Sequence, residues 1–205
     1  LHSLCSYQGK LKPALAHHLV KTFTNEGDTI IEPFSGSGTI SLEAAIQKRN
    51  CVSFDISEIA TAITVAKVNY VSFSDCRSVL DELRAYVKSN RAKKKYDPNK
   101  ITVGFNKEIK EYFHPDTMIE LLIAREFFQK IKDLSNPIWC MCFASTLHVL
   151  HGNRPYALSR RSHPLTPYAP SGDFVYKDVV DHIESKVYKS CDQQSSLSIT
   201  EGIAF

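Results

Sequence analysis

The stretch that decides the fold reads Thr29-Ile30-Ile31-Glu32-Pro33-Phe34-Ser35-Gly36-Ser37-Gly38-Thr39. A short β-branched run ends in an acidic residue, a tight Gly-x-Gly turn follows, and an apolar helical pattern begins at Ile40. Glycines at positions 36 and 38 allow backbone angles that other residues rarely adopt, and they let the chain approach a ligand closely. The order of strand, glycine loop and helix is typical of nucleotide-binding proteins with a parallel sheet.

A second β-rich run, residues 51–54, ends in Asp55. Its spacing from the glycine loop suits an acid that binds ribose hydroxyl groups. A phosphate-binding loop would require Lys and then Ser or Thr after its second glycine, whereas here Thr39 is followed by Ile40. These residues predict a nucleotide-like ligand at the carboxyl ends of parallel strands, without identifying a methyl donor. The alternative is a glycine-rich turn that only connects a strand to a helix.

The loop from Glu32 to Thr39 resembles the cofactor loop of class I S-adenosylmethionine-dependent methyltransferases, in particular the enzymes that methylate exocyclic amino groups of DNA bases. Those enzymes have an acid-Pro-Phe-x-Gly-Ser-Gly-Thr loop. Upstream, residues 7–13 (Tyr-Gln-Gly-Lys-Leu-Lys-Pro) resemble the Lys-Pro segment that contacts the methionine end of their cofactor. Downstream, residues 54–57 (Phe-Asp-Ile-Ser) resemble the segment with the ribose-binding acid. The strong resemblance covers about residues 7–67.

The resemblance implies that the cofactor is S-adenosyl-L-methionine and that the substrate is DNA. Asp55 would bind the ribose hydroxyls, and Glu32 would orient the amino group of the cofactor. Phe34 has two readings, because a Phe that follows a strand is also common in protein cores. The implied cofactor contacts come from three segments: Lys12, Pro13, Glu32, Pro33, Phe34, Ser35, Gly36, Ser37, Gly38, Thr39, Asp55 and Ile56.

The catalytic motif of this family is missing from the chain. It consists of Asp, Asn or Ser, then Pro-Pro, then an aromatic residue, and the chain contains no Pro-Pro pair. Residues 135–138 (Ser-Asn-Pro-Ile) and 166–168 (Thr-Pro-Tyr) each have a single proline, so we assign no catalytic residue. The chain ends in an apolar, strand-like stretch, residues 199–205, after which the family motif would be expected. We therefore expect the cofactor-side part of a methyltransferase, with its catalytic half elsewhere; the alternative is a non-catalytic relative.

The alternation of elements predicts an α/β protein with a partial Rossmann-like class I methyltransferase sheet and a mostly helical insert. We divide the chain into a cofactor-binding α/β part (1–72), a helical insert (73–196) and a strand that rejoins the sheet (197–205). The insert is either a target-recognition region or a helical cap or dimerisation element. The expected helices cover residues 13–24, 38–48, 57–70, 73–95, a stretch starting at 114, and 173–190; the expected strands cover 28–33 and 51–55; and residues 138–150 form an apolar segment.

A long segment without helical period, residues 151–172, is rich in Pro, Ser, Gly and Arg. Arginine forks suit phosphate oxygens and guanine edges, and tyrosines suit base stacking. Part of this segment also resembles a stretch found in a subset of bacterial DNA methylases. The alternative is a purely structural loop. The residues that we expect to contact nucleic acid are Arg154, Tyr156, Arg160, Arg161 and His163.

A second basic cluster, formed by Arg91 and Lys93 to Lys95, is better explained as a solvated helix end. The net charge of +3 leaves nucleic-acid affinity to such local clusters. The six cysteines contain no Cys-x-x-Cys pair, and His17 and His18 lack further ligands at suitable spacing. We therefore expect no metal site and a reducing cytoplasm. The chain has no run of about 18 apolar residues, so we expect no membrane span.

The leading hypothesis is a DNA methyltransferase, or its cofactor-binding part, that acts on an exocyclic amino group of adenine or cytosine, in restriction–modification. One alternative is a tRNA or rRNA methyltransferase, since some of these share the loop and a following Glu-Ala-Ala, as at residues 43–45. Such enzymes usually have an RNA-binding domain before the loop, whereas this chain has almost nothing before residue 7. A further alternative is a non-catalytic subunit that binds nucleic acid or a partner.

Overall fold

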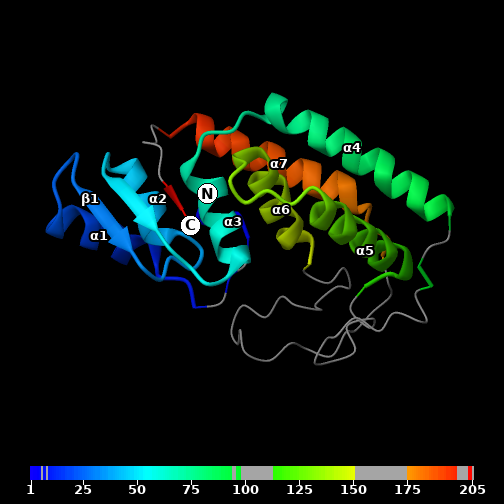
Figure 1. Ribbon diagram of the computed structural model, residues 1–205, viewed down its shortest axis with the longest axis horizontal. Helices are drawn as coiled ribbons and strands as arrows, with labels where there is room; N and C mark the ends of the chain where they lie inside the picture. Colours follow the sequence, from blue (N-terminus) through cyan, green and yellow to red (C-terminus); the bar gives the residue numbers. More distant parts are fainter. Residues whose placement is uncertain are drawn as a thin grey trace.

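The computed structural model describes residues 1–5, 7, 9–93, 96–97, 113–150, 175–197 and 203–204. A small sheet with its helices occupies one end of the molecule, and longer helices form a bundle at the other end (Figure 1). The protein is therefore mixed and rich in helix. None of the helices in these ranges combines the length and apolar character that crossing a bilayer requires.

The sheet consists of three short parallel strands in the order β1-β2-β3. Their bounds are Thr29–Glu32 for β1, Asn50–Ser53 for β2 and Ile203–Ala204 for β3. In the register of β1 and β2, Glu32 lies opposite Ser53, so both strands end at the same edge of the sheet. The expected parallel pairing is thus confirmed. The full sheet of a class I methyltransferase is larger than this one.

Two helices accompany the first strands. Helix α1 (Pro13–Phe23) has a proline in its first turn, as the sequence predicts. Helix α2 (Thr39–Ile46) connects β1 to β2 and packs against α1 and both strands. Because α2 starts directly after Gly38, the glycine loop forms the junction between strand and helix.

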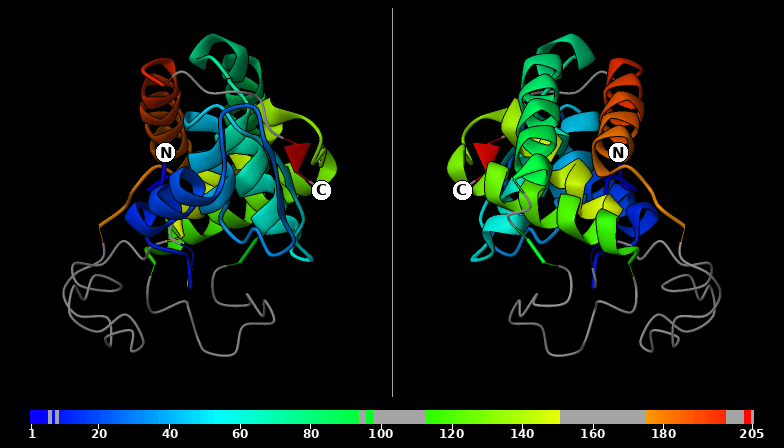
Figure 2. Two further views of the ribbon diagram at one scale, coloured as in Figure 1. Left: turned by 90° about the vertical axis from the view of Figure 1, so that its left-hand side faces the viewer. Right: turned by 90° about the vertical axis from the view of Figure 1, so that its right-hand side faces the viewer.

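The bundle contains the remaining helices. Helix α3 follows β2 and packs against α6, which in turn packs against α7; α4 contacts α5, α6 and α7 (Figures 1 and 2). Buried apolar side chains from α4, α6 and α7, such as Leu83, Met141 and Ile183, fill the space between these helices. The bounds are α3 Glu58–Val68, α4 Phe73–Ala92, α5 Pro115–Lys130, α6 Pro137–Val149 and α7 Val179–Ser195.

The last two helices differ most from the sequence-based expectation. The last helix begins at Val179 rather than at 173, because the Asp178 side chain caps it by accepting a hydrogen bond from the backbone N–H of Asp181 (2.9 Å). The apolar segment expected at 138–150 is the helix α6, which Asn136 caps and Pro137 opens. Residues 151–174, with the predicted nucleic-acid contacts, lie outside the described residues.

One edge of the sheet is formed by β1, whose described neighbour is β2 alone. Ile31 in the middle of this strand is 69% exposed, and Thr29 is also exposed. Parallel sheets are normally covered on both faces, with apolar strands buried between helices. The described part of the chain therefore leaves uncovered an apolar position that a complete parallel sheet would bury.

Candidate functional site

The glycine loop and Asp55 are in direct contact at the carboxyl ends of β1 and β2. One carboxylate oxygen of Asp55 accepts a hydrogen bond from the backbone N–H of Gly36 (2.7 Å), and the other accepts from Ser57 N–H (2.8 Å). A backbone bond from Ser35 N–H to the carbonyl of Phe54 (3.0 Å) joins the same two loops. The structure thus brings together the two features that the sequence analysis assigned to one ligand.

The two glycines of the loop have different surroundings. Both have positive φ angles, +51° at Gly36 and +66° at Gly38. A Cβ atom on Gly38 would lie 2.6 Å from Thr64 Oγ1 and 3.0 Å from Thr64 Cα, so this glycine permits close packing of the loop on α3. A Cβ on Gly36 would meet only Tyr7 Cε1, at 3.6 Å. Tyr7 belongs to the N-terminal Lys-Pro segment, which therefore reaches the glycine loop.

Two side chains of α3 donate hydrogen bonds to backbone carbonyl groups of the glycine loop. The Lys67 ammonium donates to the carbonyl of Ser37 (2.5 Å), and Thr64 Oγ1 donates to the carbonyl of Gly36 at a longer 3.5 Å. Lys67 is only 1% exposed. Burial lowers the pKa of Lys67 from 10.5 to about 8, an effect that the nearby Cys5 opposes and Lys10 reinforces. The Ser37 hydroxyl is buried and has no hydrogen-bond partner among the described residues.

Apolar side chains stand in solvent around the loop. Phe34 is 86% exposed, which excludes the reading of this residue as core. Ile56, next to Asp55, is also fully exposed. Glu32, at the end of β1, is half-buried, and this burial raises the pKa of its carboxyl group. Exposed apolar groups beside a few fixed polar groups are typical of a surface that takes up an organic ligand.

The helix that follows the Lys-Pro segment is tied to α2 by a buried carboxylate. Glu43 on α2 contacts His17 Nδ1 on α1 (3.0 Å) and His2 Nε2 (2.7 Å), one ring on each oxygen. His17 thus has a structural partner. Lys12 is exposed and lies at the N-cap of α1, and Pro13 opens that helix.

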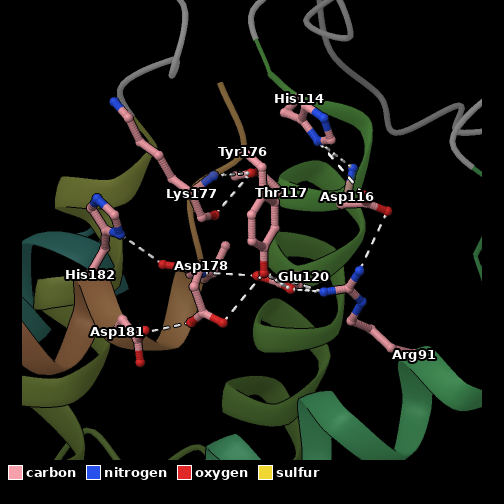
Figure 3. Close-up of polar contacts among 11 residues, drawn as sticks. Arg91, His114, Asp116, Thr117, Glu120, Tyr176, Lys177, Asp178, Asp181 and His182 are labelled. Atoms are coloured by element: carbon pink, nitrogen blue, oxygen red, sulfur yellow. Dashed lines mark hydrogen bonds and ion pairs between the residues drawn. The ribbon is translucent and has the colours of Figure 1, made fainter. Parts of the chain in front are cut away.

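The helical bundle has a polar cluster of its own, which we call the clasp (Figure 3). The Glu120 carboxylate is 1% exposed and accepts hydrogen bonds from Arg91, from Tyr176 Oη (2.7 Å) and from Val179 N–H (2.9 Å). Arg91 also lies 3.5 Å from Asp116. The clasp therefore joins α4, α5 and the start of α7, and its arginine is neutralised within the protein. Arg91 lies in the last turn of α4, as expected for a helix end, but its guanidinium pairs with Glu120 and Asp116 in addition to contacting solvent.

The residue that sequence reasoning missed at the site is Lys67. A lysine within the apolar run Ala60–Val68 is the signal that could have pointed to it, because such a run predicts a fully buried helix. Which carbonyl the lysine would contact could not be read from spacing, since Ser37 lies thirty positions away in the sequence.

Known proteins resemble the part of the chain that holds the glycine loop. Residues 6–66 match the family model described as DNA methylase. Over 80 residues, the chain is 31% identical to the type II methyltransferase M.MjaII of Methanocaldococcus jannaschii. That alignment covers 39% of this chain and 15% of the relative, so the chain spans a small fraction of the relative's length. No solved structure matches the chain. The expected resemblance to DNA amino-methyltransferases is confirmed for this region.

Proposed function

We propose that this chain is the cofactor-binding part of an S-adenosylmethionine-dependent DNA methyltransferase that acts on an exocyclic amino group of adenine or cytosine. The observation that carries the proposal is the contact between Asp55 and the glycine loop, within the residues that match the DNA methylase family. An acid fixed beside a glycine loop, at the carboxyl ends of parallel strands, is the arrangement that recognises a nucleoside.

The residues around the loop fit the parts of S-adenosylmethionine. Asp55 would accept hydrogen bonds from the ribose hydroxyls, since each carboxylate oxygen accepts more than one bond. Phe34 and Ile56 would supply apolar contact for the adenine ring. Glu32 would accept a hydrogen bond from a cofactor amino group. When bound, the cofactor supplies a methyl group on a positively charged sulfur, and the residues of this chain would bind and orient it.

The transfer step requires groups that this chain lacks, because it has no Pro-Pro motif. We propose that the catalytic half lies in further sequence or on a second polypeptide and that it joins the sheet at the β1 edge. The exposed Ile31 and the open edge of β1 support this placement, since an added parallel strand would satisfy the edge and help to cover the apolar side chain. In restriction–modification, such a two-part enzyme would methylate the host's own DNA.

For DNA contact, we propose the segment that holds Arg154, Tyr156, Arg160, Arg161 and His163. Its composition supports the proposal, because arginines bind phosphates and tyrosines stack on bases. The clasp adds an argument by exclusion: Arg91 of the other basic cluster is engaged by Glu120 and Asp116. A helical insert with this segment would serve target recognition.

Calorimetric titration of S-adenosylmethionine into the chain tests the proposal. We expect binding that Asp55→Ala weakens roughly ten- to hundredfold, since hydrogen bonds to a charged group contribute about 1.5–3 kcal/mol. The matched control is Asp28→Ala, which removes another carboxylate that accepts from a backbone N–H (Asn25, 2.8 Å), but at the opposite end of β1. Melting curves of both variants verify that the fold is intact.

The outcomes separate the candidate functions. Equal affinities of the wild type and a folded Asp55→Ala variant would overturn the role of Asp55. A folded wild-type chain that does not bind the cofactor would favour the non-catalytic subunit, whose motif would reflect ancestry alone. Cofactor binding with a preference for tRNA or rRNA over DNA would favour the RNA methyltransferase.

A further inference from the structure

Lys67 is a costly residue at its position. The residue is 1% exposed, in a helix whose other inward positions are apolar or small. Within the described residues, it forms no ion pair with a carboxylate, and the one hydrogen bond described for it goes to Ser37. An isolated buried charge destabilises a fold, and an apolar side chain of similar length usually packs there at least as well. Buried charged residues that do not increase the stability of the fold are concentrated at functional sites.

The contacts of α3 set the direction of two peptide groups. Thr64 and Lys67, one helical turn apart, bind the consecutive carbonyls of Gly36 and Ser37. Both carbonyls therefore point toward α3. In a trans peptide the N–H points opposite to the carbonyl, and the chain has no cis peptide bond among its described residues. The N–H of Ser37 accordingly points away from α3, to the open side of the loop.

We propose that Lys67 is a positioning residue of the glycine loop. By holding the Ser37 carbonyl toward the core, it keeps this oxygen away from the ligand and supports the turn in which the Gly38 N–H donates to the Ser35 carbonyl (2.7 Å). Within that turn, the Gly36 carbonyl stays on Thr64 and the Ser37 N–H stays directed to the ligand side. The ligand group that fits this donor is an acceptor, such as a carboxylate or a hydroxyl oxygen. For S-adenosylmethionine this group is the methionine carboxylate or a ribose oxygen, and this assignment rests on the proposed function.

The groups that face Lys67 come from two neighbouring segments. From residues 1–10, the Cys5 thiol raises the pKa of Lys67 and Lys10 lowers it. Burial is the main cause that lowers the pKa of His2, and the charge of Lys67 adds to this lowering. From the glycine loop, the Ser37 carbonyl is its acceptor, and that of Gly36 is bound by Thr64. Lys67 thus lies between the N-terminal segment and the glycine loop, the two regions expected to share the cofactor.

The test is hydrogen exchange of the loop amides, residues 36–40, in the ligand-free protein. We expect Lys67→Met to speed exchange there roughly tenfold, because the charged hydrogen bond that orders the loop is lost. The matched control is Lys186→Met on α7. Lys186 is partly buried and also donates to a backbone carbonyl (Ser3, 2.8 Å), but it does not touch the loop. The control should leave exchange of residues 36–40 unchanged.

Titration with S-adenosylmethionine gives the second measurement. Lys67→Met should weaken the cofactor about tenfold while the melting temperature stays equal or rises, a pairing that a purely structural lysine would not produce. Unchanged loop exchange, or a variant that no longer melts cooperatively, would overturn the proposal. If the wild type does not bind the cofactor, the proposed function fails, while loop exchange still decides the role of Lys67.

Discussion

Two buried charged side chains, Glu120 in the clasp and Lys67 at the glycine loop, differ in how many hydrogen-bond partners they have. In the clasp, Glu120 accepts hydrogen bonds from three donors, namely a guanidinium, a phenol and a backbone N–H, which come from α4 and from the start of α7. At the glycine loop, Lys67 has one neutral carbonyl as its hydrogen-bond acceptor. Both side chains are 1% exposed. Removing one partner of a paired buried charge is strongly destabilising, whereas replacing a buried charge by an apolar side chain is often neutral or stabilising. We therefore expect the clasp to stabilise the bundle and Lys67 to act on the conformation of the loop.

The same contrast appears in the titration of nearby groups. In the clasp, burial and the Glu120 carboxylate raise the pKa of Tyr176, so its hydroxyl stays a donor over the whole physiological range. At the loop, burial lowers the pKa of Lys67 from 10.5 to about 8. Tyr176 therefore keeps its proton to a higher pH than an ordinary tyrosine, whereas Lys67 loses its proton at a lower pH than an ordinary lysine.

The largest expected loss of stability comes from a substitution at Gly38. Gly38→Ala should destabilise the fold by about 2–5 kcal/mol, combining a left-handed backbone (about 1–2 kcal/mol) with overpacking against Thr64 (about 1–3 kcal/mol). Denaturant unfolding measures this change. Gly36→Ala is the matched control, because its Cβ would meet only Tyr7 at 3.6 Å and the backbone penalty alone remains. Equal losses in both variants would contradict the close packing of Gly38 on α3.

The second effect tests whether the clasp is structural. Arg91→Met should lower the free energy of unfolding by about 3 kcal/mol, because it leaves the buried Glu120 carboxylate with two of its three donors. Cofactor affinity of the folded protein should not change. The control on the same helix is Arg84→Met, whose ion pairs with Asp181 and Glu184 are exposed, so the loss should stay below about 1 kcal/mol. A similar loss in both variants would remove the distinction between clasp and surface.

The smallest effect is a pH dependence that isolates Lys67. In the folded state its pKa is about 8, against 10.5 when unfolded, so the unfolded chain binds more protons between these values and stability rises with pH. Lys67→Met lacks this gain. Any stability advantage of the variant at pH 7 should therefore shrink by about 2 kcal/mol by pH 10. Cysteines and tyrosines titrate equally in the wild type and the variant, so their contribution cancels in the difference between the two free energies of unfolding. A constant difference would mean that Lys67 is neutral or solvated at pH 7.

The sequence predicted the part of the site that is built from consecutive residues. The strand, the glycine loop and Asp55 follow from residues 29–55, because parallel strands place their carboxyl ends, and the loops that follow, at one edge. The partners of Arg91 were not predictable. An arginine within a basic cluster predicts a surface position, and Glu120 and Tyr176 lie far from Arg91 in the sequence. The start of α7 was missed because Asp178 is one of several acidic residues that could cap a helix there.

The open edge of β1 has a consequence for the chain when it is made alone. Among the described residues no strand pairs with the outer edge of β1. An exposed strand edge of this kind is a template for self-association, and Ile31 adds an apolar contact to it. Two features restrain this tendency. The strand is four residues long, and it ends in Glu32, whose charge would face its own copy in any parallel pairing in register. The short length and the charge of this edge thus disfavour aggregation between copies of the chain. A strand of different sequence could still pair with it.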